Sequence, residues 1–94
     1  MNALVPGSLQ AIIDECGLQV VRTEQAHGGD INQAFCLFTA TGKYFLKVNQ
    51  AALYPDMFLK EAAGLSALIK TKTVAIPAII KTGIAGDLQY LLLE

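Results

Sequence analysis

The chain has 94 residues, 53% of them hydrophobic and 16% charged, which gives room for one small domain and excludes a disordered tail. Its formal net charge is -1, and it has no basic run that could follow a phosphate backbone, so a nucleic-acid partner is not expected. No apolar run approaches the ~20 residues of a membrane-spanning helix, and Met1–Pro6 does not resemble a signal or transit segment, so we expect no membrane contact and a cytoplasmic protein.

The first half of the chain predicts a short helix followed by three strands. Ser8 is a suitable N-cap for a helix over Leu9–Cys16, whose apolar residues recur at helical spacing, and Gly17 ends it. Alternating apolar residues with short connections then predict an antiparallel meander. Its strands are expected at Leu18–Ala26, Asn32–Ala40 and Tyr44–Val48, with turns at His27–Asp30 and Thr41–Gly42.

The second half predicts a longer helix and two more strands. An apolar stripe at helical period covers Met57–Lys70, and Thr71–Thr73 ends it. An extended segment from Ile76 to Lys81, a turn containing Gly83 and Gly86-Asp87, and a strand over Leu88–Leu93 follow. We therefore expect an α+β fold with a five-stranded antiparallel sheet, one crossing helix and a short N-terminal helix.

Glu61 is the most informative residue of the longer helix. It falls inside the apolar stripe, between Met57 and Leu65, where an unpaired carboxylate would be costly. Lys47 is the only cation in the interior of the strand Tyr44–Val48, and a pair with Glu61 would satisfy both groups. The alternative is that Glu61 bends to the helix edge while Lys47 is solvated on an open face.

A Gly28-Gly29 turn precedes the strand of Phe35. Its backbone N–H groups could approach an anion closely, although most such pairs only supply positive φ in a hairpin. A glycine-containing loop, then a strand Lys, then a helix Glu is the order in which a kinase small lobe covers the phosphates of ATP.

Several segments together resemble the start of a fructosamine kinase, a family with the protein-kinase-like fold. They are Gly28-Gly29-Asp30-Ile31-Asn32, Tyr44-Phe45-Leu46-Lys47-Val48-Asn49, Met57-Phe58-Leu59-Lys60-Glu61-Ala62, and Ile76-Pro77 leading to Leu91-Leu92-Leu93-Glu94. The resemblance covers essentially the whole chain. It implies an ATP-dependent phosphotransferase that acts on ketosamine adducts of small amines or of protein lysines, and hence a role in deglycation.

The resemblance also implies roles for particular residues. Lys47 would bind the α- and β-phosphates of ATP with Glu61 as its partner, and the chain from Leu92 to Glu94 would lead into the hinge that binds adenine. The loop that covers the nucleotide would be Gly28, Gly29, Asp30, Ile31 and Asn32. The catalytic Asp and the ligands of Mg are expected in a second lobe beyond residue 94, so no catalytic or metal residue is assigned in this chain.

Three features depart from familiar patterns. The loop lacks the G-x-G-x-x-G pattern of protein kinases, and Phe45 stands where those enzymes keep a small alanine below adenine. Many relatives carry a cysteine where this chain has Asp30, so redox control there is not expected. Cys16 and Cys36 have no metal-like spacing, and we expect both to be reduced and buried.

The apolar ending at Leu91–Leu93 suggests that residues 1–94 are the N-terminal, nucleotide-binding lobe of a longer chain. Alone it should bind nucleotide weakly if at all, be inactive and self-associate. Two alternatives stay open: the lobe of an aminoglycoside or other small-molecule phosphotransferase, and a non-catalytic binding module. Structural roles are expected for Asp14, His27, Asp56 and Asp87.

Overall fold

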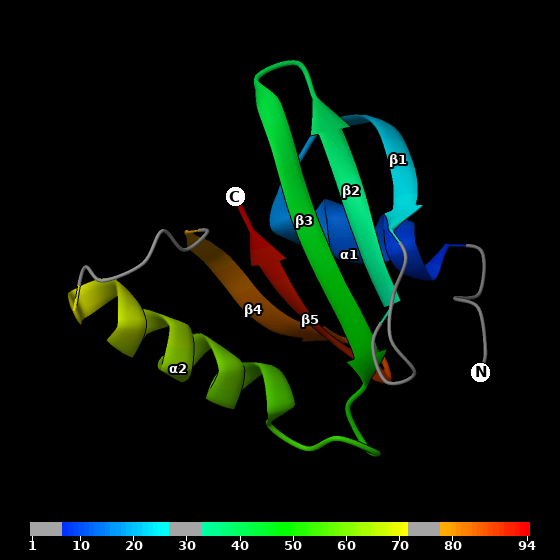
Figure 1. Cartoon of the computed structure of the whole chain (residues 1–94). Coiled ribbons are helices and arrows are strands. Elements are labelled where there is room, and N and C mark those ends of the chain that lie inside the picture. Colours follow the sequence, from blue (N-terminus) through cyan, green and yellow to red (C-terminus); the bar gives the residue numbers. More distant parts are fainter. Residues whose placement is uncertain (1–6, 27–32, 72–77) are drawn as a thin grey trace.

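The computed structural model describes residues 7–26, 33–71 and 78–94. These residues form two helices and five strands in the order expected from the sequence (Figure 1). The elements are α1 (Ser8–Cys16), β1 (Val20–Ala26), β2 (Gln33–Thr39), β3 (Gly42–Gln50), α2 (Met57–Thr71), β4 (Ile79–Ala85) and β5 (Leu88–Leu93). Neither of these helices is long and apolar enough to cross a membrane.

The five strands form one sheet in the order β1-β2-β3-β5-β4, and every neighbouring pair is antiparallel. The meander of the first three strands and the α+β architecture are thus confirmed. β3 is longer than predicted by two residues at each end, because Gly42 and Lys43 pair with β2 and both Asn49 and Gln50 pair with β5. The register places Lys47 between Ala34 and Leu91.

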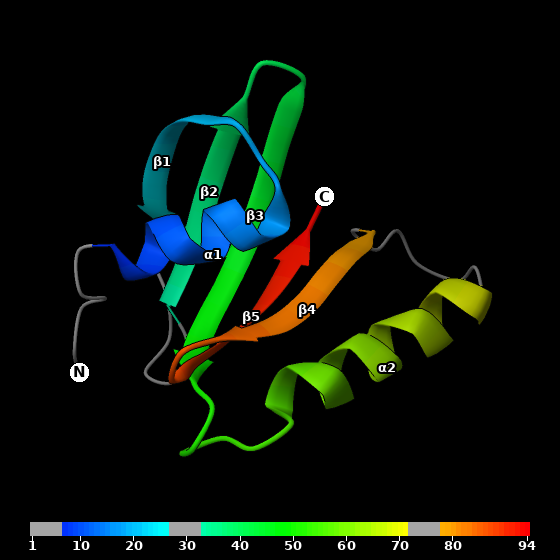
Figure 2. The same cartoon turned by 180° about the vertical axis from the view of Figure 1, so that it is seen from behind.

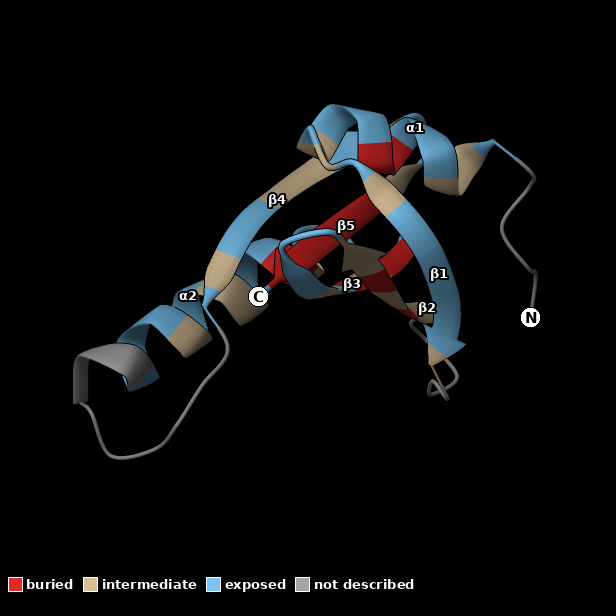
Figure 3. Ribbon diagram, turned by 90° about the horizontal axis from the view of Figure 1, so that it is seen from above, coloured by how far each residue is buried: buried red, intermediate tan, exposed pale blue. Residues whose placement is uncertain are grey.

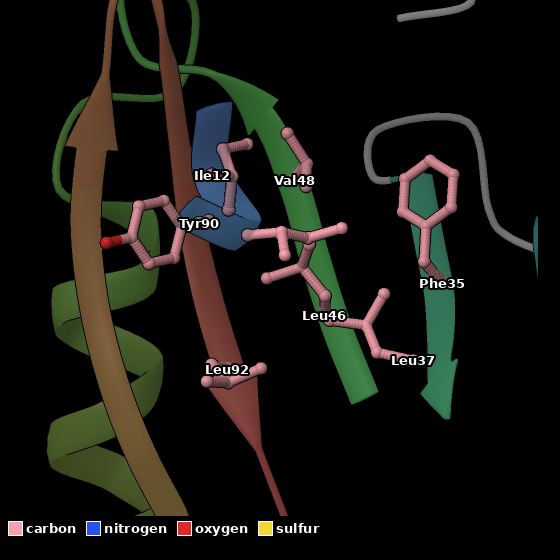
Figure 4. Close-up of a cluster of buried hydrophobic side chains, with 8 residues drawn as sticks. Ile12, Phe35, Leu37, Leu46, Val48, Tyr90 and Leu92 are labelled. Carbon is pink, nitrogen blue, oxygen red and sulfur yellow. The ribbon is translucent and has the colours of Figure 1, made fainter. Parts of the chain in front are cut away.

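Helix α1 covers one face of the sheet (Figure 2). Its two buried residues, Ile12 and Ile13, pack on side chains from the three central strands. Apolar residues at alternate strand positions point to this face, as period-2 patterning requires. The cluster contains Ile12, Ile13, Phe35, Leu37, Leu46, Val48, Tyr90 and Leu92 (Figure 4).

Helix α2 lies on the other side of the sheet, over β4 and β5 (Figure 3). Its buried Phe58 packs against Leu91 and Leu93 of the central strand β5. Met57, Ala62, Leu65 and Ile79 extend this smaller cluster. Because β5 contributes to both clusters, its residues 89 to 93 are all buried, which explains its nearly continuous apolar sequence.

Two local predictions are wrong. Gly7, not Ser8, is the N-cap of α1, and no side chain caps this helix. Gly7 takes a φ of 96°, in the left-handed region that favours glycine, so the chain turns into the helix one residue early. The second error concerns Gly83, which lies inside β4 and not in a turn.

Gly83 makes room for the side chain of Tyr90 on the neighbouring strand. A Cβ atom at Gly83 would lie 2.6 Å from Cζ of Tyr90, so any larger residue would displace the ring. With the ring lying across β4, the Tyr90 hydroxyl donates a hydrogen bond to Oε1 of Glu15, at 2.6 Å. This contact joins the sheet to the end of α1. Lys81 adds a second, since its Nζ donates to the carbonyl of Glu15 at 3.0 Å.

Candidate functional site

Lys47 and Glu61 form a direct ion pair across the face of the sheet that carries α2. Nζ of Lys47 donates a hydrogen bond to Oε2 of Glu61 at 2.7 Å. The lysine comes from the middle of β3 and the glutamate from the second turn of α2, so the structure brings together the two residues that the sequence pairs. Their side chains are 36% and 28% exposed, which leaves the ammonium accessible to a ligand.

The lysine retains donors for such a ligand. An ammonium has three N–H groups, and Glu61 is the acceptor of one of them. Glu61 also holds the long lysine side chain in one direction, which reduces the entropy lost when an anion binds. The arrangement is therefore an oriented ammonium that is suited to binding an anion.

Phe45 lies two residues before Lys47 on β3 and therefore on the same face. Its ring is 39% exposed, unusual for an aromatic residue in a central strand. Lys43 Nζ lies 5.2 Å from the centroid of this ring. Phe45 thus offers a flat apolar surface beside the Lys47 ammonium. The sequence analysis placed Phe45 at the position below adenine as a departure from the protein-kinase pattern, and it gave this residue no binding role.

Cations and rings continue on this face towards the β2–β3 turn. Arg22 lies over the Phe38 ring, 4.1 Å from its centroid, and Lys43 lies 5.9 Å from the same ring. Arg22 also pairs with Glu24 at 3.1 Å. Because both Glu24 and Glu61 are bonded to cations, the described part of this face is suited to a negatively charged or aromatic ligand.

The loop residues Gly28 to Asn32 lie outside the described residues, and their predicted role stays a prediction. The strand ends on either side of the loop are described. Ala26 and Ala34 are paired across β1 and β2, and Ala34 is also the partner of Lys47 on β3. The connection between β1 and β2 therefore starts and ends at strand positions level with Lys47.

The last predicted site residues, Leu92 and Glu94, are not brought to Lys47 by their side chains. Leu92 is fully buried in the cluster on the α1 side of the sheet. Glu94 is exposed, and its backbone N–H donates to the carbonyl of Ala78 at 2.9 Å. Their predicted contribution to adenine binding would have to come from the main chain, and it remains a prediction.

Cys36 and Cys16 are both free thiols, and each is half-buried, whereas the sequence predicted burial. Burial is the main cause that raises the pKa of the Cys16 thiol above its ordinary value, so this thiol is not activated. Among the described residues no three or more His, Cys, Asp or Glu side chains are grouped to hold a metal.

The described aspartates occupy local structural positions. Asp14 accepts a hydrogen bond from Nε2 of Gln10 at 2.8 Å, and the carbonyl of Asp87 accepts one from the N–H of Ala51 at 3.0 Å. Asp56 precedes α2 with a φ of 59°. None of the three lies in contact with Lys47 in the described structure, in agreement with their predicted structural roles. His27 lies outside the described residues.

Sequence comparisons identify relatives of this chain. A family model described as fructosamine kinase matches residues 8–94. The chain is 45% identical over 67 residues to the "Probable ketoamine kinase" of Synechocystis, and 32% identical over 91 residues to a protein of the same name from Vibrio cholerae. It is 41% identical over 68 residues to the ketosamine-3-kinase of Mus musculus.

These alignments cover 71%, 95% and 71% of this chain, but 22%, 31% and 22% of the three relatives. The chain therefore spans less than a third of the length of the curated relatives that it matches.

Solved structures show the same fold. A crystal structure named as a fructosamine-3-kinase of Haemophilus somnus matches with a TM-score of 0.74 and 26% identity, over 90% of this chain and 29% of that one. An aminoglycoside phosphotransferase solved with ADP and hygromycin B matches with a TM-score of 0.56 and 22% identity, over 93% of this chain and 28% of that one. The sheet and its two helices are the α+β small lobe of the protein-kinase-like fold. The chain belongs to the fructosamine kinase family.

Proposed function

We propose that this chain is the nucleotide-binding lobe of an ATP-dependent kinase that phosphorylates ketosamines. The observation that carries the proposal is the Lys47–Glu61 pair at 2.7 Å on an accessible face of the sheet. An ammonium oriented by a helix glutamate is the device with which kinases of this fold hold the phosphates of ATP. The family membership of residues 8–94 supports the same reading of the site.

Each described residue of the site has a part in this proposal. Lys47 binds the α- and β-phosphates through the donors that Glu61 does not use. Phe45 provides a stacking surface for the adenine ring, since its exposed face lies on the same side of β3. The loop Gly28–Asn32 covers the phosphates, and the main chain from Leu92 to Glu94 contacts adenine. ATP is thus the cofactor, and Mg would be held by acidic groups of a second lobe.

The phosphate acceptor is proposed from the relatives. They are named ketoamine kinases, a ketosamine-3-kinase and ribulosamine 3-kinases, which share an amine-linked ketose as the acceptor. We propose the same acceptor class here, on a small amine or on a glycated protein lysine, with deglycation as the outcome. The catalytic Asp that orients the acceptor hydroxyl would belong to the second lobe, and the 94 residues would not transfer phosphate by themselves.

The native protein tests this proposal. Its intact mass and its ATP-dependent phosphorylation of a fructosamine would be measured on one sample, with an aminoglycoside as the competing acceptor. We expect a mass near ~30 kDa, as a chain of about 250–300 residues would have, with turnover of the fructosamine alone. Phosphorylation of the aminoglycoside would instead assign the other enzyme class. A mass near ~10 kDa without turnover would favour a binding module.

Lysine variants of the same protein separate a site effect from a loss of fold. Lys47→Met removes the side chain that is proposed to bind the phosphates. Lys60→Met removes an exposed charge on α2 and serves as the control. We expect fructosamine phosphorylation to fall about a hundredfold or more with Lys47→Met and to be retained with Lys60→Met. Equal activity of the two variants would refute the proposed role of Lys47.

A further inference from the structure

Helix α2 meets strand β3 at two successive points. One is the Lys47–Glu61 ion pair, and the other is a hydrogen bond from Nδ2 of Asn49 to Sδ of Met57 at 3.2 Å. Two residues along a strand span about 6.7 Å, and four residues along a helix span about 6 Å. The two spacings match, so the contact at Asn49 sets the position of the first helical turn and thereby of Glu61.

A buried amide supports this second contact from the neighbouring strand. Gln89 lies opposite Asn49 in the β3–β5 ladder, and its Nε2 donates to Oδ1 of Asn49 at 2.6 Å. The same nitrogen donates to the main-chain carbonyl of Tyr54 in the connection between β3 and α2. That carbonyl also accepts the N–H of Met57, the first residue of the helix, at 3.2 Å.

These amides are unusual for their burial. Asn49 and Gln89 are each 5% exposed, and they are the buried polar residues of the described part of the chain. A buried amide cannot turn to water, so a displaced helix start would lose hydrogen bonds that water does not replace. Hydrogen bonds therefore give the start of α2 a directional anchor that the apolar packing of Phe58 against β5 would not provide.

We propose that Gln89 and Asn49 are positioning residues that anchor the start of α2 and so keep Glu61 on Lys47. The anchor itself does not depend on the proposed function. Only its consequence does, which is that Lys47 stays directed at the phosphates of a nucleotide. Within this view Gln89 acts entirely through Asn49 and Tyr54 and touches no ligand. The Lys47–Glu61 ion pair therefore depends on Gln89, a residue of β5 that is not part of the pair.

The test uses the ammonium signal of Lys47 in ¹⁵N–¹H spectra of the native protein, assigned by its loss in Lys47→Met. The chemical shift of this ammonium depends on the charge-assisted hydrogen bond to Glu61, so the signal reports on the ion pair. Gln89→Met preserves the length of the side chain and removes its donors. Gln10→Met is the matched control, because Gln10 is exposed on α1 and donates its hydrogen bond to Asp14 of the same helix.

We expect the Lys47 signal to shift or disappear in Gln89→Met and to stay unchanged in Gln10→Met. The dissociation constant of ADP should rise about fivefold or more in the first variant and remain constant in the second. An unchanged Lys47 signal in folded Gln89→Met would overturn the anchor even if ADP binds. A changed signal in a protein that does not bind ADP would support the anchor and refute the proposed function.

If Gln89→Met does not fold, Gln89→Asn serves as the second variant. Its amide is one methylene shorter, so it cannot make both of the bonds that Nε2 of Gln89 makes to Asn49 and to the Tyr54 carbonyl. We expect a shift of the Lys47 signal in this variant, and no shift would count against the anchor.

Discussion

Among single residues, Lys47 has the surroundings that most affect what the site can do. Its pair with Glu61 is neither solvated nor fully buried, because about a third of each side chain is exposed. An exposed pair is worth at most about 1 kcal/mol, whereas breaking a buried pair costs about 3–5 kcal/mol. The contribution of the Lys47–Glu61 pair to stability should lie near the lower of these two values. Such a weak pair is consistent with a lysine that must also bind a ligand.

A double-mutant cycle measures this coupling. We expect Lys47→Met and Glu61→Gln to be coupled by about 1 kcal/mol in the free energy of unfolding, since each variant leaves the other group without its partner. Urea unfolding of the two single variants and of the double variant gives the value. A coupling below about 0.3 kcal/mol would show that the pair does not form in solution and would support solvated side chains.

Because of Tyr90, the free energy of unfolding depends on pH in the alkaline range. Burial, followed by the hydrogen bond to Glu15, raises the pKa of its hydroxyl above the ordinary value of 10.0. The folded state thus holds this proton more tightly than the unfolded state does. The stabilisation is complete below a pH of about 10 and is lost as the pH rises above that value, by up to about 1.4 kcal/mol per pH unit.

Tyr90→Phe removes this proton, and Tyr44→Phe serves as the control. We expect the stability difference between the wild type and Tyr90→Phe to shrink as the pH rises from about 9 to about 11. In Tyr44→Phe, which keeps the Tyr90–Glu15 hydrogen bond, the loss of stability that Tyr90 causes in this pH range should persist. Urea unfolding at several pH values checks both, and a difference that stays constant to pH ~11 would contradict the assigned cause.

At the scale of elements, the sequence predicted one contact between α2 and β3, whereas contacts that depend on the register of β5 were not predicted. The stripe of α2 and the alternation of β3 placed Glu61 and Lys47 where they could pair, and the order of glycine loop, strand Lys and helix Glu favoured the pair over solvated side chains. The bonds of Gln89 depend on the register of β5 against β3, which no local pattern specifies. The reason for a glycine at position 83 of β4 is its packing against Tyr90 on the neighbouring strand, which the local sequence does not show. Gly83 was therefore predicted to lie in a turn.

The two helices differ in how firmly they are held. Phe58 is the fully buried side chain among the described positions of α2, and it packs on Leu91 and Leu93. The other face of the sheet has a larger cluster, which includes Ile12 of α1. An element with few buried contacts opens at a lower free energy than the core. We therefore expect the amides of α2 to exchange hydrogen faster than those of β3.

Hydrogen exchange of two core variants tests this difference. Phe58→Leu should cost about 1 kcal/mol and accelerate exchange selectively in α2. Ile12→Val, at a similar cost of about 0.5–1.5 kcal/mol, should accelerate exchange without selecting α2. The hypothesis fails if the α2 amides of the wild type exchange as slowly as those of β3.

For the whole molecule, the exposed apolar side chains and the low charge predict self-association. Seven large apolar residues are exposed in the described structure: Val21, Phe45, Leu53, Leu59, Leu68, Ile80 and Ile84. They lie on both edge strands, on β3, on α2 and in the connection before it. A formal net charge of -1 provides little repulsion between copies.

The form of the edges indicates how this association would occur. The β1–β2 ladder is irregular between Val20 and Arg22, and the β4–β5 ladder between Ile79 and Lys81. Such bulges twist an edge strand and hinder continuous pairing with another chain. We therefore expect copies to associate through apolar side chains and not by extending the sheet. Ile84, which is 64% exposed on β4, is the most accessible of these side chains at that edge.

Sedimentation equilibrium of the 94-residue chain tests this expectation. We predict reversible association at concentrations up to about 1 mM, weakened about tenfold by Ile84→Lys, because a charge in that position would have to be desolvated on contact. Gln25→Lys adds the same charge at an exposed polar position of β1 and should have a smaller effect. A monomer at all concentrations would show that the exposed apolar residues are too dispersed to form a contact. Equal weakening by both variants would show that the effect does not depend on the apolar side chain of Ile84.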